Sequence, residues 1–221
     1  MSKSLSFFIN PLIEFTNNSF AKIFLIVACL NLFSTVIFNH IVWSDIIYLN
    51  ESGLDKSNEI FLKGTYNRFI INLIVDLISP VWLIIKLGTA SILVFLVAYI
   101  LQINIIFSKV LKSFIVSFIF IIFGDIIYSS FLILVNPPFF RNDVLYFYPF
   151  SFLYFIDIES GLYSYYFIWS RINLFQLIFI VSLFLLFRNW SKLSSKNAII
   201  LTVSYVFFYG IFLVFWFLFY I

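Results

Sequence analysis

Long apolar stretches alternate with short polar segments along this chain. Five stretches are almost wholly apolar, and they cover approximately residues 23–43, 80–101, 113–135, 167–187 and 197–219. About 20 apolar residues are enough for a helix to cross a hydrocarbon core that is roughly 30 Å thick. The pattern therefore predicts an all-α, polytopic integral membrane protein, in which residues 1–221 form one transmembrane domain, a bundle of five helices.

The two long connections, residues 44–79 and 136–166, differ in character. The first ends in an apolar run, residues 69–79, which is too short to cross alone. We expect it to lie at the interface or to extend the second helix outward, with Pro80 at a kink or in a first helical turn. In the second connection, the aromatic residues 144–156 predict an interfacial or re-entrant element. A sixth crossing is the alternative for that stretch.

The N-terminal residues precede the first span as a separate element. Apolar residues between Leu5 and Phe15 predict a short helix that lies in the headgroup layer. Pro11 and the polar run Asn17-Asn18-Ser19 argue against a continuous helix with the first span.

Basic residues are distributed unevenly between the two sides of the predicted membrane domain. Residues 1–22, 102–112 and 188–196 hold seven lysines and arginines, whereas the longer segments 44–79 and 136–166 hold four, with eight of the ten acidic residues. Cytoplasmic loops carry the excess of lysine and arginine. The sequence therefore predicts a cytoplasmic N-terminus and a C-terminus on the outside.

Composition narrows the class of protein. Hydrophobic residues make up 63% of the chain and charged residues 10%, whereas soluble domains are about 25% charged. This balance excludes a disordered chain, a nucleic-acid-binding surface and a soluble cytosolic enzyme. The expected partners are the lipid bilayer and other membrane proteins.

Ionisable residues within spans are costly to bury and are therefore candidates for function. The sequence has three, Lys86, Asp125 and Arg171, at similar predicted depth, and Gln176 can add hydrogen bonds. One hypothesis is an ion- or proton-coupled site, or a pocket for a charged lipid headgroup. The other is an ion pair that holds the bundle together, with the two cations reaching outward toward water.

Other polar or small residues carry weaker signals. Cys29 lies in mid-span and is expected to behave as a small apolar residue. His40, the only histidine, is expected to be an interfacial hydrogen-bonding residue and, without His, Cys or carboxylate neighbours, not a metal site. Residues 88–91 form a small-residue patch that another helix could approach closely. We find no metal-ligand pattern, cofactor motif or catalytic motif, so nothing specific points to an enzyme.

The layout resembles the Yip family of five-span membrane proteins. The resemblance is carried by Asn10-Pro11 before the first span, the basic entry 107–113 to the third span, the aromatic-aliphatic run 172–179 in the fourth, and the basic loop 192–196 before the last. Eukaryotic members interact with Rab GTPases in vesicle traffic. The long N-terminal region of those members has no counterpart here, so the resemblance favours short bacterial members and a bacterial cytoplasmic membrane, with a eukaryotic endomembrane as the alternative.

Two classes of function follow. The leading hypothesis is a non-catalytic membrane protein that acts as an adaptor, an organiser or a subunit of a membrane complex. The alternative is a small ion- or proton-coupled transporter or channel subunit that uses Asp125 with Lys86 and Arg171. A membrane enzyme is a third, less specific hypothesis.

Overall fold

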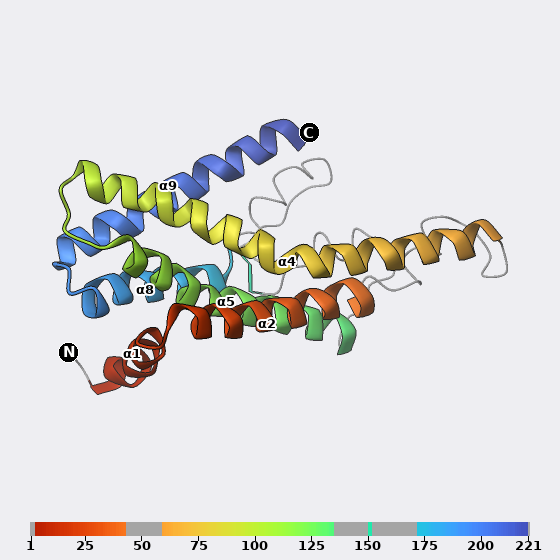
Figure 1. The fold of residues 1–221 in the computed structure, drawn as a ribbon, viewed down its shortest axis with the longest axis horizontal. Coiled ribbons are helices and arrows are strands. Elements are labelled where there is room, and N and C mark those ends of the chain that lie inside the picture. The colour runs from red at the N-terminus through yellow and green to blue at the C-terminus, as the bar shows by residue number, and fades with distance from the viewer. Residues whose placement is uncertain (1–2, 43–58, 135–149, 152–171, 221) are drawn as a thin grey trace. The chain divides into compact units, whose positions relative to one another are not determined.

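The computed structural model describes residues 3–42, 59–134, 150–151 and 172–220 (Figure 1). These residues are helical apart from short turns and one isolated β-bridge between Ser151 and Asn173. In chain order the helices are α1 (Lys3–Thr16), α2 (Phe20–Ile37), the π-helical turn η1 (Phe38–Val42), α4 (Glu59–Ile100), α5 (Phe107–Leu134), α8 (Leu174–Leu185), the π-helical turn η3 (Leu186–Trp190) and α9 (Ser195–Tyr220). The all-α prediction is confirmed for this part of the chain.

Within the described ranges, four helical segments are long and apolar enough to cross a membrane. They are Phe20–Val42, Tyr66–Ile100, Phe107–Leu134 and Ser195–Phe215. The chain is therefore an integral membrane protein with a helical fold. Four of the five predicted spans coincide with these segments, although the third helix begins at Phe107 rather than at residue 113.

The predicted fourth span has a shorter helical counterpart. Its apolar helical segment is Leu174–Trp190, and Ile172 and Asn173 before it are not helical. The prediction that residues 172 and 173 are part of this helix was wrong. Asn173 instead pairs with Ser151, and the backbone N–H of Leu174 donates to the carbonyl of Phe150 at 3.1 Å. Residues 167–171 lie outside the described residues, so the count of five spans stays a prediction.

Helix α4 is much longer than the predicted second span. It has 42 residues, about 63 Å at 1.5 Å per residue, and it begins at Glu59 rather than at residue 80. The apolar run 69–79 therefore extends the second helix, as one of the two alternatives predicted. Pro80 lies inside the helix and not in its first turn. It has no N–H to donate to the carbonyl of Asp76, but packing against neighbouring helices allows a spanning helix to tolerate this loss.

The chain divides into two compact units. Unit 1 consists of Met1–Ala28, Leu83–Ile121 and Phe175–Ile221, and unit 2 consists of Cys29–Trp82 and Ile122–Leu174. Helices α2, α4 and α5 contribute residues to both. The three segments predicted to be cytoplasmic all fall in unit 1, and the two predicted outer segments fall in unit 2.

Aromatic rings fill the core of unit 1. Phe114 of α5 is completely buried, and its ring centroid lies 6.2 Å from that of Phe179, 6.4 Å from that of Phe187 and 5.2 Å from that of Tyr205. Half of the apolar window of α5 is buried, against 22% for α9. Helix α5 is thus the more central of these two helices.

Unit 2 has a smaller apolar core where η1 meets α5. Val42, Tyr128 and Leu132 are buried together, and Phe38 and Ile133 pack against them. The rings of Phe38 and Tyr128 are tilted, with centroids 6.3 Å apart.

Helix α1 is the short N-terminal helix predicted from the sequence, and it is separate from α2. Figure 1 shows α1 at an angle to α2, with the chain turning between them. Helix α1 ends at Thr16, which is buried and whose hydroxyl donates to the carbonyl of Ile13 at 2.7 Å. The backbone N–H of Lys22 then lies 3.4 Å from the Ser19 hydroxyl at the start of α2, so the polar run interrupts the helix as expected.

Candidate functional site

The four candidate residues from the sequence fall in different parts of the fold. Lys86 on α4 and Gln176 on α8 belong to unit 1, whereas Asp125 on α5 belongs to unit 2. Arg171 lies outside the described residues. The mutual neutralisation of the acid and the two bases therefore stays a prediction.

Lys86 and Gln176 both contact aromatic groups within unit 1. The Lys86 Nζ lies 4.8 Å from the ring centroid of Phe118, in cation–π geometry. Gln176 donates through Nε2 to the hydroxyl of Tyr205 at 3.2 Å, at the edge of the aromatic core. In each case a polar group that would be costly in an apolar environment has a specific partner.

A polar cluster in unit 2 centres on Asp76. The Asp76 side chain is buried on α4, with the residue only 6% exposed. Its Oδ2 lies 2.7 Å from Nε2 of His40, and its Oδ1 accepts a hydrogen bond of 2.8 Å from Nδ2 of Asn39. Asn72, one turn away on α4, donates to the carbonyl of Asn39 at 2.9 Å. We call Asn39, His40, Asn72 and Asp76 the Asp76 cluster.

The π-helical turn η1 explains how two consecutive residues reach the same carboxylate. Consecutive side chains on an α-helix point about 100° apart, and a π-helical turn has more residues per turn, so the angle between them is smaller. Asn39 and His40 both lie in η1 and each binds one oxygen of Asp76. Phe69 packs edge-on against the His40 ring, with centroids 5.7 Å apart.

The Asp76 cluster corrects one prediction. His40 was expected to have no carboxylate neighbour, and it has one, contributed by a helix 36 residues further along the chain. Asp76 was not among the candidate residues because it lay in a segment assigned to a connection. A signal was present in the sequence: Asn72, Asp76, Ser79 and Leu83 follow helical spacing and so share one face of α4.

The arrangement allows a charge-assisted hydrogen bond between the imidazole and the carboxylate, and the Asn39 amide holds the second carboxylate oxygen in place. Within the described residues, no group of three or more His, Cys, Asp or Glu side chains could hold a metal ion.

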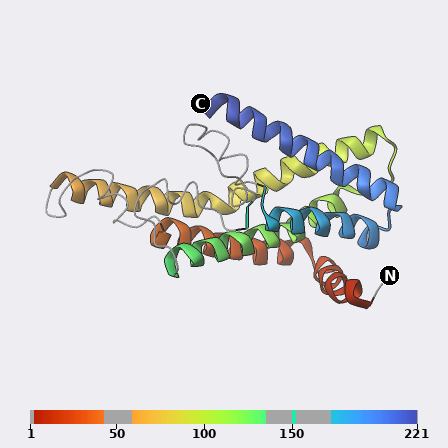
Figure 2. The same cartoon turned by 180° about the vertical axis from the view of Figure 1, so that it is seen from behind.

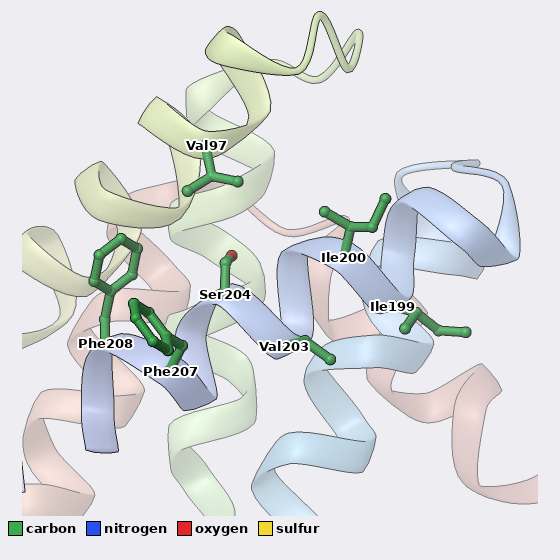
Figure 3. Close-up of a pocket in the computed structure, with 7 residues that line it drawn as sticks. All are labelled: Val97, Ile199, Ile200, Val203, Ser204, Phe207 and Phe208. Atoms are coloured by element: carbon green, nitrogen blue, oxygen red, sulfur yellow. The ribbon is translucent and has the colours of Figure 1, made fainter. Parts of the chain in front are cut away.

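An apolar groove of about 490 Å³ lies between α4 and α9 in unit 1 (Figure 3). It is lined by Val97, Ile199, Ile200, Val203, Ser204, Phe207 and Phe208. Figure 3 shows the Ser204 side chain on α9 directed toward Val97 on α4. Val203 and Phe207 are 58% and 63% exposed, so this face of α9 is covered little by the rest of the fold.

Two glycines on the same two helices face open space. A Cβ atom added at Gly88 on α4 or at Gly210 on α9 would meet no atom within 4 Å. The small-residue patch at residues 88–91 therefore has an open side at Gly88 and a buried side at Ser91. The Ser91 hydroxyl donates to the carbonyl of Leu87 at 2.7 Å. Among the described residues, no side chain of another helix contacts the Cβ position of Gly88.

Comparison of the whole chain with protein-family models, with curated proteins and with solved structures finds no match. The resemblance to the Yip family thus stays an expectation from the sequence pattern.

Proposed function

We propose that this chain is a non-catalytic, polytopic membrane protein that acts as an adaptor, an organiser or a subunit of a membrane complex. The observation that carries the proposal is the apolar groove between α4 and α9, which the described residues leave open (Figure 3). In this proposal, the groove receives a transmembrane helix of another membrane protein.

The spacing of residues along α9 supports a helix as the occupant. Ile199, Val203, Phe207 and Gly210 lie three or four positions apart and form one row on the helix. Helices associate in membranes through close packing, and small residues allow their backbones to approach. The row combines an apolar groove with a glycine whose Cβ position is empty, which is the geometry that a second helix can use.

Site-specific photocrosslinking in native membranes tests the proposal. A photoreactive amino acid at Val203 should give a discrete protein adduct, because this position lines the groove. The matched control is Leu25 on α2, which is 64% exposed and does not line the groove. Protein adducts at Val203 but not at Leu25 support the adaptor function, and lipid adducts alone at both positions contradict it.

A second variant separates loss of the partner from loss of the fold. Gly210→Leu places a large side chain where no atom of the chain lies within 4 Å, so the protein should stay folded. The same side chain would block the approach of a partner helix. We expect the Val203 adduct to disappear in Gly210→Leu while the elution volume and helical content stay unchanged.

The proposal includes five spans with the N-terminus in the cytoplasm and the C-terminus outside, in a bacterial cytoplasmic membrane or, alternatively, a eukaryotic endomembrane. The charge of the two units supports this orientation. Unit 1 holds eight of the 13 lysines and arginines and one of the ten acidic residues, and basic residues concentrate on the cytoplasmic side. A Yip-like assignment is consistent with this layout.

A small ion- or proton-coupled transporter or channel subunit is the second candidate function. The pair of the partly exposed His40 and the buried Asp76 favours it, because ionisable pairs within spanning helices are typical of proton and ion pathways. Asp125, with Lys86 and Arg171, remains the site proposed from the sequence. In liposomes, proton or ion flux that Asp76→Asn or Asp125→Asn abolishes in folded protein would support transport, and flux insensitive to both changes would exclude these sites.

A further inference from the structure

Positive charge gathers at one end of unit 1. Figures 1 and 2 show that α1, the turn between α4 and α5, and the turn leading into α9 lie at this end. The cations here are Lys22 near the start of α2, Lys109 near the start of α5, Arg188 in η3, and Lys192 and Lys196 around the start of α9. We call these five residues, with Trp190, the basic end of unit 1.

Trp190 joins the segments of the basic end. Its indole N–H donates to Oδ1 of Asn17, after α1, at 3.1 Å. The ring centroid lies 5.6 Å from the Nζ of Lys109 and 5.9 Å from that of Lys112, both on α5. Lys112 in turn donates to the carbonyl of Asn18 at 2.9 Å. The end of α1, the start of α5 and the η3–α9 turn are therefore fixed around one tryptophan.

Most of the cations at this end form no ion pair within the described part of the fold. Lys22, Arg188, Lys192 and Lys196 are exposed, and among the described residues none of the four forms an ion pair. Lys112, by contrast, is held by backbone carbonyls. The exposed cations are thus available to an anion outside the chain.

The helix ends add to the positive potential. Helices α2, α5 and α9 all begin here, with Lys22, Lys109 and Lys196 respectively in or near the first turn, and none has an acidic residue in that turn. The N-terminus of a helix carries partial positive charge, so a cation there is unfavourable and an anion is stabilising. An anion bound near three such ends and three lysines would therefore be stabilised.

We infer that the basic end of unit 1 binds the phosphate headgroups of anionic phospholipids in the adjacent leaflet. Exposed lysine and arginine supply the charge, and a tryptophan with an apolar body and a polar N–H is typical of the headgroup level. The basic end would recognise a singly charged phosphate group, and the lipids of the surrounding membrane would supply that group. This inference does not depend on the adaptor function.

Native mass spectrometry of the full-length protein, released from dodecylmaltoside micelles, tests it. The probes are dioleoylphosphatidylglycerol and dioleoylphosphatidylcholine, which differ in headgroup charge but not in acyl chains. The test variant is R188Q/K192Q/K196Q, and the matched control K56Q/K63Q/R141Q removes three charges from unit 2. R188K/K192R/K196R keeps the charge and shows whether the sites tolerate substitution.

We expect the wild-type protein to bind phosphatidylglycerol more tightly than phosphatidylcholine. The glutamine variant should lose at least tenfold in affinity for phosphatidylglycerol, since each surface cation contributes about fivefold at an anionic leaflet. The control and the charge-conserving variant should bind like the wild type. Added salt should weaken the preference.

Equal binding of the two lipids, or equal losses in the test and control variants, would overturn the inference. Displacement of phosphatidylglycerol by an equal concentration of inorganic phosphate would show a site for free phosphate instead. Stoichiometric capture of a polyglutamate peptide, without a preference between the lipids, would assign the surface to an acidic protein partner and would also overturn it.

Discussion

The Nε2 atom of His40 lies 2.7 Å from Oδ2 of Asp76, and this contact joins the unit 2 parts of two membrane-length helical segments. The carboxylate also accepts a hydrogen bond from Asn39. In an apolar surrounding, neither the carboxylate nor the ring nitrogen can be left without a partner at low cost. The pair therefore positions η1, the C-terminal end of the first span, against α4.

Asp76→Ala should lower the free energy of unfolding by about 1–3 kcal/mol, because it leaves His40 and Asn39 without their acceptor. The measurement is equilibrium unfolding of detergent-solubilised protein by added dodecyl sulfate, followed by circular dichroism. Ile78→Ala is the control, since Ile78 is 53% exposed on the same helix. Equal stability of Asp76→Ala and the wild type would show that the Asp76 cluster does not hold the helices together.

Phe114→Ala should destabilise the protein more than Tyr205→Phe. Phe114 is completely buried and its ring meets three other aromatic rings, so its removal leaves a cavity that costs about 3–5 kcal/mol in soluble proteins. Tyr205→Phe loses only the hydrogen bond from Gln176, worth about 1 kcal/mol. The same unfolding assay ranks the two variants, with the exposed Phe212→Ala as control. The reverse ranking would refute the packing described for unit 1.

Trp190→Ala should release α1 from η3. The indole bonds to Asn17 directly after α1, and α1 packs against η3. Hydrogen–deuterium exchange measured by mass spectrometry should rise across residues 3–16 in this variant. Trp190→Phe keeps a ring beside Lys109 and Lys112 and should show a smaller rise. Unchanged protection of α1 in Trp190→Ala would contradict the docking role of Trp190.

Gly88→Ala and Gly210→Ala should each stabilise the protein by about 0.5–1 kcal/mol. Glycine within a helix is less favourable than alanine by this amount, and the added methyl group meets no atom within 4 Å at either position. The dodecyl sulfate midpoint measures the gain. A loss of stability at either site would mean that a part of the chain packs there.

The helical membrane fold could be predicted from the sequence because it depends on the length of apolar runs, which is a local property. The short α1 was also predictable, since Asn17-Asn18-Ser19 offers side-chain hydrogen bonds that compete with the helix. The predicted positions of the helix ends were less accurate. The extension of α4 to Glu59 passes through polar residues whose helicity the apolar pattern does not record.

The candidate site was predicted less well, for a physical reason. His40 and Asp76 are distant in sequence, and a π-helical turn sets the direction of Asn39 and His40. No rule of periodicity identifies such a turn in advance. Lys86, chosen for its depth, and Gln176, chosen as a hydrogen-bonding residue, have partners in unit 1, where Phe118 and Tyr205 contact them. The depth of a polar residue along a span can be estimated from the sequence, but its side-chain partner on another helix cannot.

The central claim is that lipid, rather than water, surrounds the exposed apolar faces of these helices. Cys29 tests it directly, because it is the only cysteine of the chain and its side chain is exposed on α2. In intact membranes, a membrane-impermeant maleimide added to both sides should leave Cys29 unmodified, and the same reagent should modify it after dodecyl sulfate is added. A cysteine introduced at Ser194, in the turn before α9, is the positive control. Rapid modification of Cys29 in the intact membrane would contradict the claim.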